Sequence, residues 1–170
     1  MSKIHKDYKS LSLKDKQKIT QGSIIPRPIA WVSTINENDS INLAPFSYFA
    51  QLSATLVAIS FTKPKEGHKH TYRNIMRTHE AVIHLGDVGL LKALDKTSAS
   101  LPYNESELDG LNLTLKESDH IKTPYIDEAL ISFEVKLERE LEFMSDDYSK
   151  VDNNVVFLRI LSVHLDDSVY

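Results

Sequence analysis

Two segments near the start of the chain combine residue types that can hold a flat ligand. PRPIAWVST, residues 26–34, is an apolar run that ends on two adjacent hydroxyls. NLAPFSYF, residues 42–49, sets small residues, a proline and aromatics around Ser47. Because proline has no backbone N–H, strand pairing is interrupted at Pro45 and neighbouring backbone groups stay free for a ligand. The two segments therefore predict an apolar slot with polar groups at its edge, which suits a planar, amphipathic ring.

A third segment, KHTYRNI at residues 69–75, predicts a site for phosphate. It places a cation and a hydroxyl, Lys69 and Thr71, just before a helix-like pattern, with Arg73 and Asn74 in the first turn. A helix N-terminus offers unpaired backbone N–H groups and the positive end of its dipole, and lysine adds a point charge. The three segments together predict one flat aromatic ligand that carries a phosphate, and we take this ligand to be a flavin.

Each segment also has a purely structural interpretation, which stays open at this point. Thr71 could simply cap the helix while the neighbouring cations are solvated. Trp31, Phe46 or Tyr48 could wall the ring slot, but Trp31 and Phe46 could equally be core aromatics.

Composition and motifs exclude several other classes of function. The chain has 170 residues, which suits one domain, and its net charge of −4 gives no basis for nucleic-acid binding. It has no cysteine, no HExxH, no GxSxG, no Walker loop and no GxGxxG, so we expect neither a metal site nor a Rossmann or serine-hydrolase mechanism. No apolar run is long enough for a membrane span and the first residues are polar, so we predict a cytoplasmic protein with no membrane contact.

Hydrophobic patterning predicts a mainly β protein, a closed barrel with short helical insertions. Residues 1–22 are predicted as a leader with a short helix, and helices are expected to start at Thr71 and Asp87. The segment 130–137 alternates, which predicts one wet face carrying Ser132, Glu134 and Lys136. The segment 155–165 is apolar almost throughout, so we expect it to be covered on both faces, the outer one by another subunit. Residues 98–124 are predicted as a long loop that has a function or wraps a partner. Further strands are expected at 29–35, at 55–62, ended by a turn at 63–67, and at 81–85.

In these motifs the chain resembles the flavin reductase-like, FMN-binding split-barrel family, which includes flavoredoxins. The resemblance runs from Gly22 to Leu85 and continues more loosely through residues 106–113 and the final strand. It implies a six-stranded Greek-key split β-barrel, a homodimer, and FMN held noncovalently near the subunit interface. A single domain over residues 1–170 is expected, with residues 1–21 as leader and short helix.

The resemblance also assigns roles by position. It places Ser33 and Thr34 beside the flavin, residues 42–47 along the ring edge, and Lys69, Thr71 and Asn74 on the phosphate side. The candidate cofactor-binding residues are Arg27, Trp31, Ser33, Thr34, Asn42, Ala44, Pro45, Phe46, Ser47, Ser60, Lys69, Thr71 and Asn74. No residue is assigned a catalytic role, because the isoalloxazine itself carries the chemistry.

Two departures from the family pattern bear on function. His70 stands where the family usually has an aspartate, which removes a negative charge near the phosphate. Many members also continue past the last strand into a segment that helps close the site, whereas this sequence ends at Tyr170, so a more open donor side is expected. The predicted function is hydride transfer from NAD(P)H to FMN and electron transfer onward. The alternatives are an FMN-binding carrier or sensor without NAD(P)H turnover, and a barrel that has lost flavin and serves as an interaction module.

Overall fold

The computed structural model describes residues 2–64 and 67–170. Two residues of the turn predicted at 63–67, Lys65 and Glu66, lie outside this description. The elements in chain order are η1 (Tyr8–Ser10), α1 (Leu13–Ser23), β1 (Ala30–Ile35), β2 (Ile41–Phe46), β3 (Phe49–Gln51), β4 (Leu56–Thr62), α2 (His70–Thr78), β5 (Glu80–Leu85), α3 (Leu91–Lys96), β6 (Leu115–Lys116), β7 (Tyr125–Ile126), β8 (Ile131–Met144) and β9 (Val151–Leu165).

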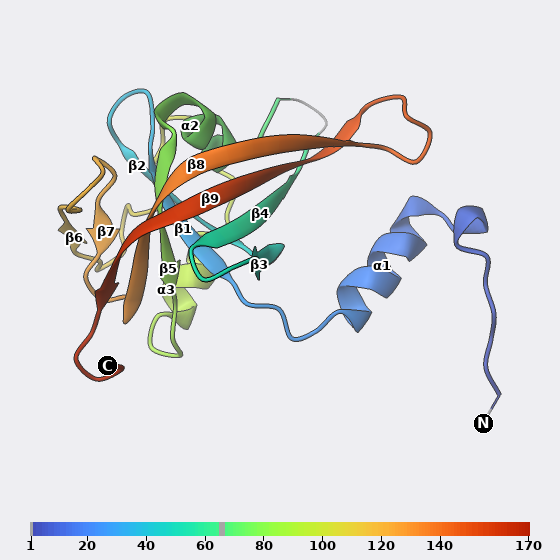
Figure 1. Ribbon diagram of the computed structural model, residues 1–170, viewed down its shortest axis with the longest axis horizontal. Helices are drawn as coiled ribbons and strands as arrows, with labels where there is room; N and C mark the ends of the chain where they lie inside the picture. Colours follow the sequence, from blue (N-terminus) through green and yellow to red (C-terminus); the bar gives the residue numbers. More distant parts are fainter. Residues whose placement is uncertain (1, 65–66) are drawn as a thin grey trace.

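The main body is one curled antiparallel sheet (Figure 1) with the strand order β2-β1-β5-β8-β9-β4-β3. Its edge strands β2 and β3 are joined directly through Ser47 and Tyr48, so the sheet must curl to bring its two edges together. The Ser60 N–H donates to the Tyr48 carbonyl at 2.9 Å at this join. The mainly β class is confirmed, but the sheet has seven strands rather than six, because the bend after Phe46 divides one apolar segment into two short strands.

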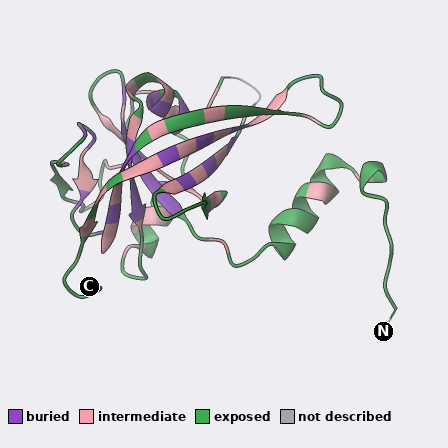
Figure 2. Cartoon of the chain, in the orientation of Figure 1, coloured by how far each residue is buried: buried purple, intermediate pink, exposed green. Residues whose placement is uncertain are grey.

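Alternation along the strands divides the core into two clusters. Val32 of β1 points to the barrel interior, where it packs with Ile59, Ile75 and Leu158. The neighbouring Trp31 points to the other face of the sheet. Successive side chains of a strand lie on opposite faces, so one short apolar run serves both clusters. Figure 2 shows the resulting concentration of buried residues along the central strands.

Strand β8 has a burial pattern that alternation alone does not predict. Lys136 is exposed as expected, but Ser132 and Glu134 are fully buried, so the prediction of a wet face is wrong for these two. The Glu134 carboxylate accepts hydrogen bonds from the backbone N–H groups of Asp119 and His120, both at 2.8 Å, and Nε2 of His164 lies 2.7 Å away. Burial raises the pKa of Glu134, but these contacts outweigh it and hold the pKa below its usual value.

The start of α2 also differs from the prediction. Lys69 occupies the N-cap position and its side chain makes no capping hydrogen bond. Thr71 is the second residue of the helix, and its Oγ1 accepts a hydrogen bond from the Asn42 side chain at 2.8 Å instead of capping. Before α3, Asp87 accepts the Leu90 N–H at 3.1 Å and the helix begins one residue later, at Leu91.

The N-terminal region stands apart from the barrel (Figure 1). None of the residues in α1 is buried. The helix contacts the tip of the β8–β9 hairpin through an ion pair between Lys16 and Asp146. Over the described residues, the helices are all too short or too polar to cross a lipid bilayer.

Candidate functional site

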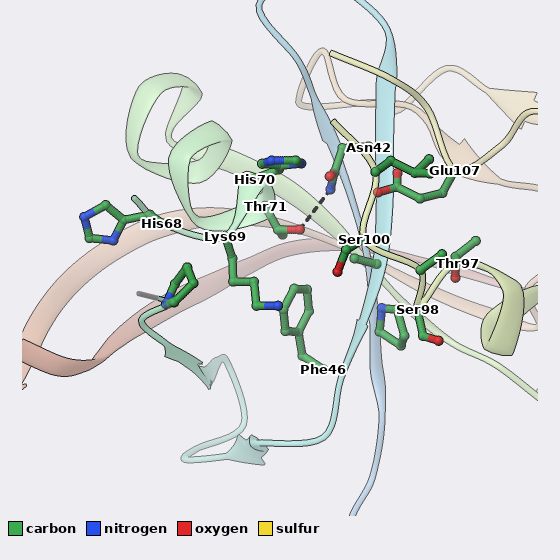
Figure 3. Close-up of a pocket in the computed structure, with 15 residues that line it drawn as sticks. Asn42, Phe46, His68, Lys69, His70, Thr71, Thr97, Ser98, Ser100 and Glu107 are labelled. Atoms are coloured by element: carbon green, nitrogen blue, oxygen red, sulfur yellow. Dashed lines mark hydrogen bonds between the residues drawn. The ribbon is translucent and has the colours of Figure 1, made fainter. Parts of the chain in front are cut away.

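A cavity of about 280 Å³ opens between the edge strand β2, the N-terminus of α2 and the loop that follows α3. Six of the residues selected from the sequence line it: Asn42, Ala44, Pro45, Phe46, Lys69 and Thr71. Figure 3 shows Phe46 and Lys69 on the same side of the cavity, with the Asn42–Thr71 hydrogen bond at its back wall. The two sequence segments predicted to hold a ring and a phosphate are thus adjacent in space.

One end of the cavity is suited to an anion. Lys69 lies there, at the N-terminus of α2, with His68 and His70 on either side of it in sequence (Figure 3). The first-turn N–H groups of a helix have no partner within the helix, and the N-cap side chain supplies none here. Burial, together with the charges of Arg73 and Lys69, lowers the pKa of His70, which favours its neutral form.

Thr34 and Asn74 lie beneath the cavity rather than in its wall. The Asn74 side chain donates to Thr34 Oγ1 at 3.1 Å and to Asn36 Oδ1 at 2.8 Å. Thr34 Oγ1 also lies 3.3 Å from the Asn42 amide nitrogen, which in turn holds Thr71. All four polar side chains of the Thr34–Asn42–Thr71–Asn74 network are buried. This network fixes the back wall of the cavity, since a buried polar group is stable only when it is paired.

The remaining candidates lie elsewhere. Trp31 is fully buried, and its Nε1–H donates to Thr97 Oγ1 at 2.8 Å. Ser33 donates to the Pro124 carbonyl at 3.0 Å, on the face of the sheet opposite the barrel interior. Neither these residues nor Arg27, Ser47 and Ser60 line the cavity. Arg27 donates to the backbone carbonyls of Gln21 and Ile24, and Ser60 accepts from Asn153 at 3.3 Å.

The wall that faces Lys69 is not predicted by the sequence motifs. It comes from the loop after α3 and includes Thr97, Ser98, Ser100 and Glu107. The available signal was the length of this loop, which predicted a function without indicating which residues carry it. The Trp31 indole donates a hydrogen bond to the Thr97 hydroxyl and so positions Thr97 in the cavity wall. Trp31 therefore supports the cavity without lining it.

Glu107 is positioned by the exposed edge of the sheet. Among the described residues, strand β2 pairs with β1 alone, so its outward N–H and C=O groups need other partners. The Leu43 N–H donates to Glu107 Oε2 at 2.8 Å, and Ser106 Oγ donates to the Ile41 carbonyl. Burial raises the pKa of Glu107, against the opposing effects of the Leu43 N–H and the backbone N–H of Glu107 itself.

One other cluster in the described part of the chain has the composition of a metal site. Ligand atoms of Asp119, Glu134 and His164 lie within 4.8 Å of one another. Both Glu134 oxygens already accept backbone N–H groups, and the His164 ring lies against Glu134 Oε1 and stacks on Tyr125. These contacts explain why the three residues lie together: they anchor the loop that covers β8.

Fold and site together define a split barrel with a half-open cavity that is cationic at one end. The chain matches the model of the flavin reductase-like domain over residues 22–170, and it belongs to this family. The resemblance seen in the sequence is thereby confirmed.

Relatives and solved structures agree with this membership. The uncharacterized protein YwrF of Bacillus subtilis is 37% identical over 162 residues, covering 94% of this chain and 78% of its own. The crystal structure of nitrilotriacetate monooxygenase component B from Bacillus cereus superimposes with a TM-score of 0.94 at 31% identity, covering 100% of this chain and 85% of its own. A Shewanella frigidimarina structure with a split barrel domain has a TM-score of 0.79 at 20% identity, covering 97% and 81%, and supports the fold. Family and neighbours support an oxidoreductase-like role that uses a flavin.

Proposed function

We propose that this protein binds FMN in the cavity between β2 and α2. The observation that carries the proposal is the pairing of an uncapped helix N-terminus and Lys69 at one end with the apolar wall of Ala44, Pro45 and Phe46. The donor set fits the cofactor, because a phosphate needs converging N–H groups and a cation, whereas the ring needs an apolar slot. Lys69, Thr71 and the first turn of α2 would hold the phosphate.

We further propose that the protein is an NAD(P)H-dependent oxidoreductase. When bound, FMN supplies the two-electron chemistry, taking hydride from a reduced nicotinamide and delivering electrons to another acceptor. The residues of the chain bind and orient the cofactor, and the buried Thr34–Asn42–Thr71–Asn74 network keeps the cavity wall rigid. The name of the Bacillus cereus neighbour, a monooxygenase component, favours a second protein as the acceptor.

The direct test of this activity is an anaerobic spectrum of the FMN-loaded protein before and after addition of NADH or NADPH. We expect the visible flavin absorbance to bleach with one of the two nucleotides. A protein that binds FMN but stays oxidised with both would be a flavin carrier or sensor, and the reductase proposal would fail.

Replacing Lys69 by alanine should weaken FMN binding by about tenfold to a hundredfold, because the charge-assisted contact to the phosphate is lost. The affinity for riboflavin, which has no phosphate, should change little. Fluorescence titrations with both flavins measure this. Lys92→Ala, an exposed lysine of α3 away from the cavity, is the control. Equal losses for FMN and riboflavin in Lys69→Ala would place the phosphate elsewhere.

We also propose that the protein is a homodimer. Residues paired across antiparallel strands share a face, and the outer face of β8 and β9 places Leu141 beside Val155, with Phe157 further along β9. Leu141 and Phe143 are 39% and 52% exposed, an apolar surface that a second subunit could cover. The inward-facing Val156 and Leu158 are fully buried in the barrel. A second subunit would therefore have to cover only the outer face of β9 to make it a doubly covered strand.

Replacing Phe157 by glutamate should therefore dissociate the dimer without unfolding the barrel. Light scattering should give twice the chain mass of 19.3 kDa for the wild type and a single chain mass for the variant. Lys92→Glu, on the exposed surface of α3, should stay dimeric. A Phe157→Glu protein that keeps the wild-type mass would exclude this face as the interface.

A further inference from the structure

The cavity has opposite chemical character at its two ends. Lys69, His68 and His70 lie at one end, and Glu107 lies at the other, beyond Asn42 (Figure 3). Glu107 is only 7% exposed. A carboxyl group buried to this extent normally has a counter-charge or a full set of hydrogen bonds.

Glu107 has only part of that set. Its Oε2 accepts the Leu43 N–H at 2.8 Å, which explains why one oxygen faces the edge of β2. The second oxygen has no hydrogen-bond partner in another described residue, and no lysine, arginine or histidine of the described chain forms an ion pair with the carboxylate. The carboxylate also interacts with the backbone N–H of Glu107 itself. Glu107 borders the cavity, and two carboxylate oxygens can accept about four hydrogen bonds, so the group has acceptor capacity left for a ligand.

We propose that Glu107 is a specificity-determining residue that accepts a hydrogen bond from an N–H group on the ring of the bound ligand. The inference rests on the proposed FMN function and extends it. An ionised carboxylate can only accept hydrogen bonds, so the ligand edge placed against it must carry a donor. The oxidised isoalloxazine has a single ring N–H, at N3, flanked by two carbonyl groups. Glu107 therefore selects the orientation in which the pyrimidine edge lies at its end of the cavity.

The charge distribution of the cavity favours this orientation. An anionic phosphate is stabilised by Lys69 and the α2 N-terminus, but would be repelled by Glu107. An N–H donor is instead stabilised beside Glu107 and disfavoured beside Lys69. A ligand with a phosphate tail and an imide-type ring edge is therefore complementary to both ends, and the desolvation that raises the pKa of Glu107 is offset when the ligand supplies the missing donor.

The test compares FMN with 3-methyl-FMN, in which a methyl group replaces the hydrogen on N3. Isothermal titration of the wild-type protein should show FMN binding about tenfold to a hundredfold more tightly than the methylated analogue. Glu107→Gln keeps a carbonyl oxygen for the Leu43 N–H but removes the charge, so we expect weaker FMN binding and a smaller preference over the analogue. Glu105→Gln, an exposed position two residues away in the same loop, should behave like the wild type.

The outcomes separate this inference from the function on which it rests. If the wild type binds both flavins equally well, FMN binding stands and the role of Glu107 is refuted. If it binds neither flavin, the proposed function itself fails. A Glu107→Gln protein that melts like the wild type and retains its full preference for FMN would also refute the inference. The wild-type comparison needs no variant, so the test does not depend on whether Glu107→Gln folds.

Discussion

Replacing Trp31 by alanine should lower the free energy of unfolding by about 3–5 kcal/mol, the usual effect of truncating a buried aromatic. The side chain is 0% exposed and packs with Leu43 and Ile126 in the second core cluster. Its loss would also leave the Thr97 hydroxyl without the indole donor that lies 2.8 Å away. Urea denaturation of the wild type and the variant measures the difference.

This experiment decides between the two interpretations of Trp31 that the sequence leaves open. Trp31→Phe, which keeps much of the volume, should be less destabilising and separates the loss of packing from the loss of the Thr97 contact. A Trp31→Ala protein with wild-type stability would contradict the role of Trp31 as a core residue.

Acidification should destabilise the protein before most carboxylates are protonated, because of His84. The side chain is fully buried, the Ile126 N–H donates to its Nε2 at 3.0 Å, and Nδ1 lies 2.8 Å from the Trp31 carbonyl. Nε2 must therefore be unprotonated, with the hydrogen on Nδ1. Burial lowers the pKa of His84 from 6.5 to about 4, which outweighs the opposing hydrogen bond to Trp31.

The sign of the effect follows from the lowered pKa. Above pH 6.5 His84 is neutral in both folded and unfolded chains, and its contribution is fully present. As the pH falls from 6.5 towards 4, the unfolded chain takes up a proton that the folded chain resists, which costs about 3 kcal/mol of stability.

Urea denaturation at several pH values should show this loss for the wild type. The loss should be smaller across the same window for His84→Gln, which has no titrating group at this position. His5→Gln, at an exposed position, should follow the wild type. Wild-type stability that stays constant from pH 6.5 to 4.5 would contradict the burial of a neutral His84.

The sequence predicts the barrel well where burial follows simple alternation. Strands β1, β4, β5 and β9 fall within a few residues of their predicted positions, because their apolar runs are bounded by turn residues. It fails at Ser132 and Glu134, which are both fully buried. Glu134 is covered by the loop that donates the backbone N–H groups of Asp119 and His120 to its carboxylate. Nothing in the local pattern of β8 reports on a partner so distant along the chain.

The candidate site shows the same limit. Asn42, Ala44, Pro45, Phe46 and Lys69 line the cavity because they lie on the edge strand and on the helix N-terminus where the motifs place them. Thr34 and Asn74 have the hydroxyl and amide groups that a ligand site needs, but they use them for each other. Glu107 reaches the cavity only because the loop after α3 docks on the free edge of β2, a tertiary contact without a sequence signature.

The most direct test of the account is a crystal structure of the protein grown with FMN. We predict the phosphate within hydrogen-bond distance of Lys69 Nζ and the first-turn N–H groups of α2, with the ring against Phe46. FMN bound at another surface, or a cavity that excludes it at saturating concentration, would contradict the assignment of this site.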